Sequence, residues 1–181
     1  ADNVEAIEVK EAAEVMELHD ALKSGKLQYD TVCLDSVSEI SEILLTWEKS
    51  RSKDPRMAYG NVQESVTNLM RAFRDLNMHV LFLCKEDVVN DDGILRHAPK
   101  MVGTKLGESI TYFFDEVLAL RIIEDQDDEG KNIQNRWLQT VYGQGYKAKD
   151  RSGKLDNFEQ PNISALIEKL GFSLTSDNKG E

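Results

Sequence analysis

Residues 29–36 have the sequence YDTVCLDS, an almost unbroken apolar run that ends in an acid and a hydroxyl. Such a run is typical of a parallel β-strand covered on both faces. Residues 79–84, HVLFLC, form a second run of the same kind. We therefore expect the two runs to be strands of one parallel sheet.

The segment between these runs has the periodicity of two helices. An expected first helix, capped by Ser36 or Ser38, carries an apolar stripe of Ile40, Ile43, Leu44 and Trp47. After a polar break at residues 49–55, the strongest amphipathic pattern of the chain comprises Val62, Val66, Leu69, Met70, Phe73 and Leu76. A helix between two buried strands is how a crossover connection is built.

The flanking segments complete the predicted fold. We expect a short strand at Ile7–Val9, a helix from residue 12 to 22, an antiparallel strand pair at 117–123 and 137–142, and a short helix at 162–170. Residues 85–111 show little periodicity, as in a functional or mobile connection. The predicted fold class is α/β, with a mainly parallel sheet flanked by helices and a C-terminal antiparallel pair. One domain is expected over residues 1–175, followed by a flexible tail over 176–181.

Composition and charge exclude several classes of protein. The chain has 181 residues, of which 40% are hydrophobic and 30% charged, so it can bury a core. Its net charge of −11 argues against a free-standing basic nucleic-acid binder, which leaves open a local basic patch. No apolar run approaches the roughly 18 residues of a membrane span. Cys33 and Cys84 lie in apolar runs and are expected in the core of a cytoplasmic protein.

Asp35 is the first candidate functional residue. A carboxylate at the carboxyl end of a buried parallel strand lies at the sheet edge where α/β proteins bind ligands. In nucleotide-hydrolysing folds that position holds Mg²⁺, usually through water. The alternative is that Asp35 and Ser36 only cap the helix that follows.

The segment YKAKDRSGKL is the strongest basic exception to the acidic balance. Lys147, Lys149 and Arg151 alternate, so an extended chain would place them on one face, ready for phosphate. The alternative is an edge strand protected by lysines. Trp47 and Trp137 are more typical of a core than of a stacking platform, and we identify no interleaving of aromatic and basic residues.

Two further patterns bear on metal and phosphate binding. The acids of DVVNDDG, with Glu86 before them, suggest a cation-binding loop, but they lack the spacing of an EF-hand. The 181 residues contain no GxxxxGK[ST] phosphate loop, and the Ser-Gly-Lys tripeptides at Ser24 and Ser152 are each followed by Leu.

The order of the motifs resembles a known family. YDTVCLDSVSEI, a helix carrying YGNV, HVLFLC, PKMVGTKLGESITYFFDEVLAL, RWLQTV and YKAKDRSGKL follow one another as in phage-type RecA-like P-loop ATPases, which include nucleotide-binding and single-strand annealing proteins. The resemblance covers about residues 26–170. It implies a RecA-like P-loop NTPase core that is incomplete at its N-terminus, in the host cytoplasm if viral.

The resemblance also implies roles for individual residues. Asp35 would be the Mg²⁺-associated acid of the Walker B strand, with Ser36 beside it. The residues near the γ-phosphate would be Cys84, Lys85 and Glu86, where many relatives carry Thr or His. Lys149 and Arg151 would be fingers that act on the nucleotide of a neighbouring subunit. The implied cofactors are ATP and Mg²⁺, and the implied partners are further copies of the chain and single-stranded DNA, contacted by the loop 86–107.

The front of the chain departs from the family pattern, because the Walker A strand, loop and helix are missing. Either these elements lie upstream of Ala1, or the chain is a variant that has lost nucleotide binding. The predicted function is therefore a RecA-like ATPase core in DNA recombination or single-strand annealing that needs an upstream Walker A. The alternative is a non-catalytic α/β interaction module that assembles through its open sheet edge.

Overall fold

The two apolar runs form a parallel strand pair in the computed structural model, which describes residues 4–126 and 129–173. Strand β1 (Thr31–Asp35) pairs with β2 (His79–Leu83), from Thr31 opposite His79 to Asp35 opposite Leu83. The predicted adjacency and parallel direction of the two strands are confirmed. The register places Asp35 and Leu83 together at the carboxyl end of the pair.

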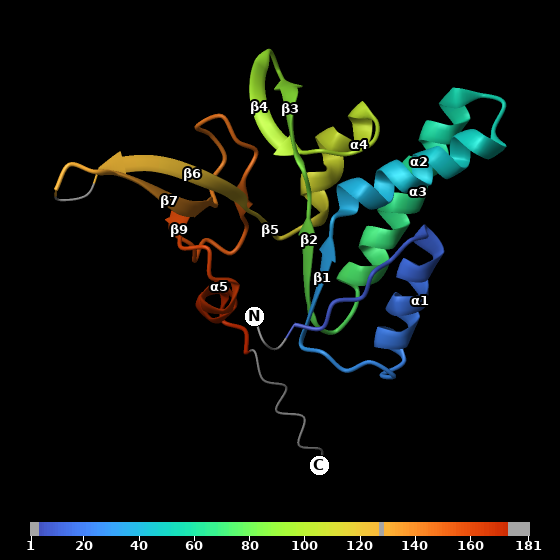
Figure 1. Ribbon diagram of the computed structural model, residues 1–181, viewed down its shortest axis with the longest axis horizontal. Helices are drawn as coiled ribbons and strands as arrows, with labels where there is room; N and C mark the ends of the chain where they lie inside the picture. The colour runs from blue at the N-terminus through green and yellow to red at the C-terminus, as the bar shows by residue number, and fades with distance from the viewer. Residues whose placement is uncertain (1–3, 127–128, 174–181) are drawn as a thin grey trace. The chain divides into compact units, whose positions relative to one another are not determined.

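Three helices lie on one side of this strand pair (Figure 1). Helix α1 (Ala12–Lys23) precedes β1, while α2 (Val37–Arg51) and α3 (Pro55–Arg74) connect β1 to β2. Their starts follow local sequence signals. The Ser36 hydroxyl accepts a hydrogen bond from the Glu39 amide at 3.3 Å, and Asp54 caps α3, whose first residue is Pro55.

The core of this part of the chain lies between the helices and the strands. Val15 and Leu22 of α1 and Leu69 and Phe73 of α3 form a buried cluster. Alternate strand side chains pack against this cluster, because successive side chains of a strand point to opposite faces; they are Val32, Leu34, Val80 and Phe82.

The opposite face of the strand pair is not covered as predicted. Cys33 is exposed and the Leu83 side chain is 44% exposed, so the expectation of strands buried on both faces, with Cys33 in the core, is wrong. Trp47, expected in the apolar stripe of α2, is 49% exposed. Each apolar run is therefore buried mainly on the one face that packs against the helices.

The contacts within the chain divide it into two compact units. Unit 1 comprises Ala1–Lys85 and Lys100–Leu106, and unit 2 comprises Glu86–Pro99 and Gly107–Glu181. The single domain expected over 1–175 stays a prediction, and the tail at 176–181 lies outside the described residues.

Unit 2 is built from short antiparallel sheets (Figure 1). A hairpin pairs β3 (Glu86–Asp91) with β4 (Ile94–Pro99), and β5 (Glu116–Val117) pairs with β8 (Lys149–Asp150). A three-stranded sheet has the order β6 (Ala119–Gln126), β7 (Asn132–Gln139), β9 (Phe158–Glu159). The remaining elements are α4 (Thr104–Ser109), which runs across the boundary of the units, a 3-10 helix (Ile110–Phe113) and α5 (Ile163–Leu170).

The observed fold is mixed α/β, and the predicted mainly parallel sheet is not found. Among the described residues β1–β2 is the parallel strand pair, and the other strand pairs are antiparallel. The predicted C-terminal antiparallel pair is confirmed as β6–β7. Residues 4–10 form no strand, so the strand expected at Ile7–Val9 is wrong.

The hairpin β3–β4 accounts for much of the connection that showed no periodicity. Asp92 and Gly93 turn the chain with positive φ angles of 52° and 86°, which suits a two-residue hairpin. The signal was present as an Asp-Gly pair. It was obscured because β3 is mostly exposed and carries three acids, so it lacks the apolar alternation of a half-buried strand. No helix in the described part of the chain is long and apolar enough to cross a membrane.

Replacing Phe73 with Ala should lower the free energy of unfolding by about 3–5 kcal/mol, because the ring of this α3 residue is fully buried against α1 and β2. Urea unfolding followed by circular dichroism measures this. Met57→Ala in the same helix is the control, since Met57 is 61% exposed and should change stability by less than about 0.5 kcal/mol. Equal effects of the two substitutions would contradict the packing described.

Candidate functional site

Asp35 lies exposed at the carboxyl end of the β1–β2 pair, directly before helix α2. The Asp35–Ser36 peptide bond is cis. The neighbouring Ser36 hydroxyl caps α2 through the Glu39 amide. Within residues 4–126 and 129–173, the Asp35 carboxylate has no hydrogen bond or ion pair. Ser36 therefore serves as the helix cap, and the carboxylate of Asp35 is uncommitted.

The buried hydroxyl of Ser38 fixes this edge of the sheet. Its side chain is 1% exposed and donates to the Lys100 carbonyl oxygen at 2.6 Å. The same hydroxyl accepts from the Lys85 amide at 2.9 Å. The Lys100 amide in turn donates to the Lys85 carbonyl at 2.7 Å. The start of α2, the end of β2 and the segment at Lys100 are thus joined through one side chain.

Acidic and basic side chains from these segments meet beside Ser38. The Lys85 ammonium lies 2.6 Å from a Glu39 carboxylate oxygen and 3.6 Å from Glu42. Lys100 lies 3.8 Å from Glu42. The hydrogen bond that Lys85 donates to the Glu39 carboxylate raises the pKa of Lys85. The edge therefore presents two cations held by carboxylates of α2. These carboxylates follow Asp35 closely in sequence, and the carboxylate of Asp35 itself has no such partner among the residues that the structure describes.

Cys84 follows β2 and is not suited to chemistry at neutral pH. Burial raises the pKa of its thiol to about 11, against the opposite effect of a hydrogen bond with Ser38. Because the thiolate is the form that attacks electrophiles or binds metals, the Cys84 thiol is inert under ordinary conditions. Its place beside Ser38 indicates a packing role.

The donor set at this edge fits a magnesium–phosphate complex and no all-protein metal cage. Across the described ranges, no group of three or more His, Cys, Asp or Glu residues is arranged to hold a metal ion. Mg²⁺ is usually bound by one or two carboxylates together with substrate phosphates and water. The single free carboxylate of Asp35 meets that requirement.

The acidic segment DVVNDDG forms one strand and the turn of a structural hairpin and not a cation loop. Asp91 lies 2.9 Å from Lys147 and 3.2 Å from Arg96, and it also accepts a hydrogen bond from Tyr142. Hydrogen bonding with Lys147 and then Tyr142 lowers the pKa of Asp91. Asn90 accepts from the Gly93 amide within the turn. The cation-loop reading is therefore wrong.

The other predicted site residues belong to unit 2, and each has a partner there. Glu86 lies 2.7 Å from the His97 imidazole, whose ring stacks on Tyr146. Lys149 donates to the Thr111 carbonyl at 2.8 Å, and Arg151 lies 2.7 Å from Asp115. Together with the Lys147–Asp91 pair, these contacts give the three alternating cations of the basic segment a partner each. The roles assigned to Glu86, Lys149 and Arg151 stay predictions.

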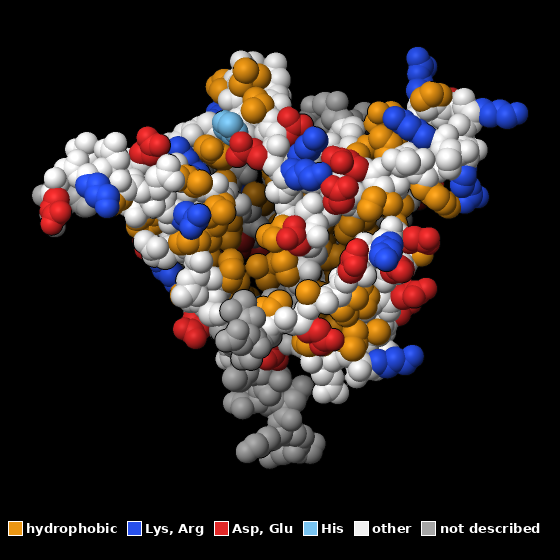
Figure 2. Space-filling model, viewed as in Figure 1, with side chains coloured by type: hydrophobic (Ala, Val, Ile, Leu, Met, Phe, Trp, Pro, Cys, Tyr) orange, Lys and Arg blue, Asp and Glu red, His pale blue; other side chains and the backbone are white. Residues whose placement is uncertain are grey.

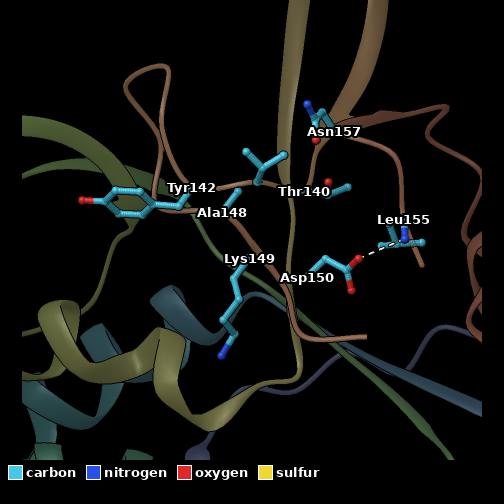
Figure 3. Close-up of a pocket in the computed structure, with 8 residues that line it drawn as sticks. Thr140, Tyr142, Ala148, Lys149, Asp150, Leu155 and Asn157 are labelled. Atoms are coloured by element: carbon cyan, nitrogen blue, oxygen red, sulfur yellow. Dashed lines mark hydrogen bonds between the residues drawn. The ribbon is translucent and has the colours of Figure 1, made fainter. Parts of the chain in front are cut away.

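Unit 2 also contains an open pocket of about 350 Å³ between β8 and the segments around residues 140 and 157 (Figure 3). Asp150 lines it, and its carboxylate accepts hydrogen bonds from the Ser152 hydroxyl and from the amides of Ser152, Gly153 and Leu155. In Figure 3 the Lys149 side chain runs away from this carboxylate. The Thr140 hydroxyl donates to the Asp156 carbonyl. These hydrogen bonds hold the loop at residues 150–157 in place.

Glu116 and Asp150 form a carboxyl pair, since they lie opposite each other in the β5–β8 register. Burial and the hydrogen bond with Asp150 raise the pKa of Glu116 to about 7. Burial alone would raise the pKa of Asp150, but hydrogen bonds from Ser152 and Leu155 hold it at about 2. The pair therefore shares one proton at slightly acid pH.

Sequence reasoning missed Ser38 as the centre of the edge, together with Glu42 and Lys100. Ser38 was named only as an alternative helix cap. A small hydroxyl in the first turn of a helix carries no strong signal of this role, because its partners are backbone groups 47 and 62 residues away. Lys100 was one of many charged residues in a segment without periodicity.

A comparison with protein-family models matches residues 1–152 to a family described as AAA domain. No curated protein and no solved structure matches the chain. The matched segment includes both strands of the parallel pair and the whole of the Asp35 edge.

Replacing Ser38 with Ala should lower the free energy of unfolding by about 1–3 kcal/mol, because a buried hydroxyl with two backbone partners is lost. Amide hydrogen exchange should show selective loss of protection at Lys85. Ser50→Ala is the control, since the exposed Ser50 hydroxyl bonds only within its own helix. Unchanged protection at Lys85 would contradict the role given to Ser38.

Replacing Glu116 with Gln should change how stability depends on pH. Because the folded protein raises this pKa from 4.5 to about 7, it binds a proton that the unfolded chain releases, so stability falls as pH rises through this window. The variant lacks this loss and should be more stable than wild type above pH 7. The carboxyl is only partly buried, so we expect about 1 kcal/mol.

Thermal unfolding at a series of pH values measures the effect of Glu116→Gln, with the exposed Glu17→Gln as control. The control should keep the wild-type pH dependence. An identical pH slope for Glu116→Gln and wild type would show that the carboxyl pair does not share a proton.

Proposed function

The chain belongs to the AAA domain family, and from this premise we propose that it is part of a nucleotide-binding ATPase whose phosphate-facing edge is the carboxyl end of β1–β2. The observation that carries the proposal is the uncommitted carboxylate of Asp35 at this edge. Ligands of open α/β sheets bind at the carboxyl ends of parallel strands. We further propose the phage RecA-like type, acting in DNA recombination or single-strand annealing, which the order of the sequence motifs supports.

In this proposal Asp35 holds Mg²⁺ through water. The bound ion would neutralise phosphate charge, as it does in P-loop ATPases. The Ser38 network keeps the start of α2 and the end of β2 in fixed register, which positions Asp35 relative to Lys85. Preorganisation of this kind lowers the cost of ordering charged groups around a phosphate.

Lys85 is the residue at this edge best placed to meet a phosphate oxygen. Its ammonium is about half exposed and is held by Glu39 and Glu42. Cys84, predicted beside it as part of a sensor, would act only through packing, because its thiol stays protonated at neutral pH.

Tight triphosphate binding also requires a phosphate loop. These 181 residues contain no GxxxxGK[ST] motif, whose backbone N–H groups and lysine normally cradle the phosphates. We therefore propose that a segment outside these residues supplies the loop. The chain by itself should bind Mg-nucleotide only weakly.

The proposal includes catalysis between subunits, with Arg151 as the stronger candidate finger. Its side chain is 77% exposed, and its side-chain partner among the described residues is an exposed Asp115, so it can exchange this partner for a phosphate. Lys149 donates into the Thr111 carbonyl and is partly buried. Such a role requires assembly of several copies of the chain.

The second candidate function is a non-catalytic module that assembles through its sheet edge. It is favoured by one observation: neither β1 nor β2 pairs with a second strand among the described residues. A two-stranded sheet is marginal alone, and unpaired edges accept strands from a partner.

Titration of the ¹⁵N-labelled chain with ATP and Mn²⁺ in place of Mg²⁺ tests the nucleotide proposal. The paramagnetic ion should broaden the amide signals of Asp35, Ser36 and Lys85 first, because they lie at the proposed phosphate edge. Asp35→Asn should reduce this broadening at least several-fold.

Asp30→Asn is the matched control, since Asp30 precedes the same strand at its other end and should leave the broadening unchanged. Broadening that is equal in Asp35→Asn and wild type, or that is confined to other segments, would reject the nucleotide edge. The second candidate would then be tested by sedimentation, where a strictly monomeric chain counts against it.

A further inference from the structure

The tip formed by residues 47–59 differs in charge from the rest of the chain. We call this segment, which contains the end of α2, the loop and the start of α3, the α2–α3 tip. It contains four cations and two acids, in a protein whose net charge is −11. The four cations are Lys49, Arg51, Lys53 and Arg56. Figure 2 shows Lys and Arg side chains projecting from this end of α2 and α3, with hydrophobic side chains beside them.

The cations of the tip are not neutralised by carboxylates. In the described part of the chain, none of the four forms an ion pair, whereas Lys85, Lys147, Arg151 and others are paired. The two acids of the tip already have polar partners. Asp54 accepts from the Arg56 amide at the start of α3, and Glu48 accepts from the Asn61 side chain at 2.9 Å.

Exposed aromatic rings accompany these cations. Trp47 is 49% exposed and Tyr59 is 42% exposed. The Arg51 guanidinium lies 4.4 Å from the centre of the Trp47 ring, and the Lys49 ammonium lies 5.1 Å from that of Tyr59. Each ring is therefore joined to a cation. This is the interleaving of aromatic and basic residues that we did not identify in the sequence.

From this arrangement we propose that the α2–α3 tip binds single-stranded nucleic acid. Unpaired cations attract backbone phosphates, and exposed aromatic rings stack on bases that are free of a complementary strand. A duplex would offer the phosphates but not the base faces. An anionic membrane surface is a weaker fit, since Trp47, Met57 and Tyr59 are the only large apolar side chains exposed at the tip.

This surface is separate from the proposed nucleotide edge. Helix α2 has 15 residues, so at a rise of about 1.5 Å per residue its last residue lies roughly 22 Å along the helix from Ser36, and Trp47 lies roughly 16 Å along it. The inference deepens the DNA-related part of the proposed function by naming a surface. It rests on the tip residues alone, so loss of nucleotide binding at Asp35 would leave it standing.

Fluorescence anisotropy of labelled oligodeoxythymidine and oligouridine, about 12 nucleotides long, tests the proposal without added nucleotide. We expect binding at about 50 mM NaCl. The logarithm of the association constant should fall linearly with the logarithm of the salt concentration, with a slope of about −2 to −3 for three or four phosphate contacts. The two oligomers distinguish DNA from RNA, and binding of either supports the proposal. A DNA duplex of the same length should bind at least about five-fold more weakly.

The double substitution Arg51→Glu with Lys53→Glu should weaken binding by about ten-fold or more. The control pair Lys23→Glu with Lys26→Glu makes the same change of charge at two exposed lysines, one at the end of α1 and one just after it, and should have less than about a two-fold effect. Circular dichroism confirms that both variants fold. Equal weakening by the two pairs would overturn the proposal, because it would show only a response to net charge.

Tryptophan fluorescence gives a second readout. With Trp137→Phe as background, Trp47 is the remaining tryptophan, and oligodeoxythymidine should quench its emission if bases stack on it. Absence of quenching together with absence of a change in anisotropy would overturn the proposal. So would binding to phosphatidylcholine vesicles containing about 30% phosphatidylserine without binding to either oligonucleotide.

Discussion

The hydroxyl of Ser38 is the contact on which the candidate site depends. It is fully buried, and it bonds the Lys85 amide and the Lys100 carbonyl, which lie far from it in sequence. A buried hydroxyl that lost these partners would carry an uncompensated desolvation cost, so the three segments are held in one arrangement. The parallel pair β1–β2 alone would not give this precision, since a two-stranded sheet is marginal in isolation.

Much of unit 1 could be predicted because its signals are local. Apolar spacing located α1, α2 and α3, and Ser36 and Asp54 cap the helices that follow them. The adjacency of β1 and β2 followed from two apolar runs joined by helices. Coverage of both sheet faces could not be predicted, because a short apolar run has the same pattern whether one face or both are buried.

The candidate site was predicted less completely than the fold. Asp35 was identified because a strand end is visible in sequence, and the structure places it at the predicted edge. Ser38 and Lys100 were missed because their contacts join segments that are distant in sequence. The α2–α3 tip was missed because Trp47 fits the apolar spacing of α2, and only the structure shows that its ring is exposed and joined to Arg51.

The distribution of charge separates structural cations from available ones. Lys147 and Arg96 bond with Asp91 in unit 2, and Lys85 bonds with Glu39 in unit 1, so they contribute to local order. The four cations of the α2–α3 tip have no such carboxylate partners within the described ranges. An acidic chain can thus carry one surface suited to a polyanion, and net charge alone would have hidden it.

The central claim is that β1 and β2 run in parallel and end together at Asp35 and Leu83. Nuclear Overhauser effects between backbone protons of the labelled chain measure this directly. Parallel strands in this register should give cross-strand effects that connect the neighbourhood of Cys33 with that of Leu81, and the neighbourhood of Asp35 with that of Leu83. Effects that instead connect Thr31 with Leu83, as in an antiparallel pair, or no effects between the two strands, would contradict it.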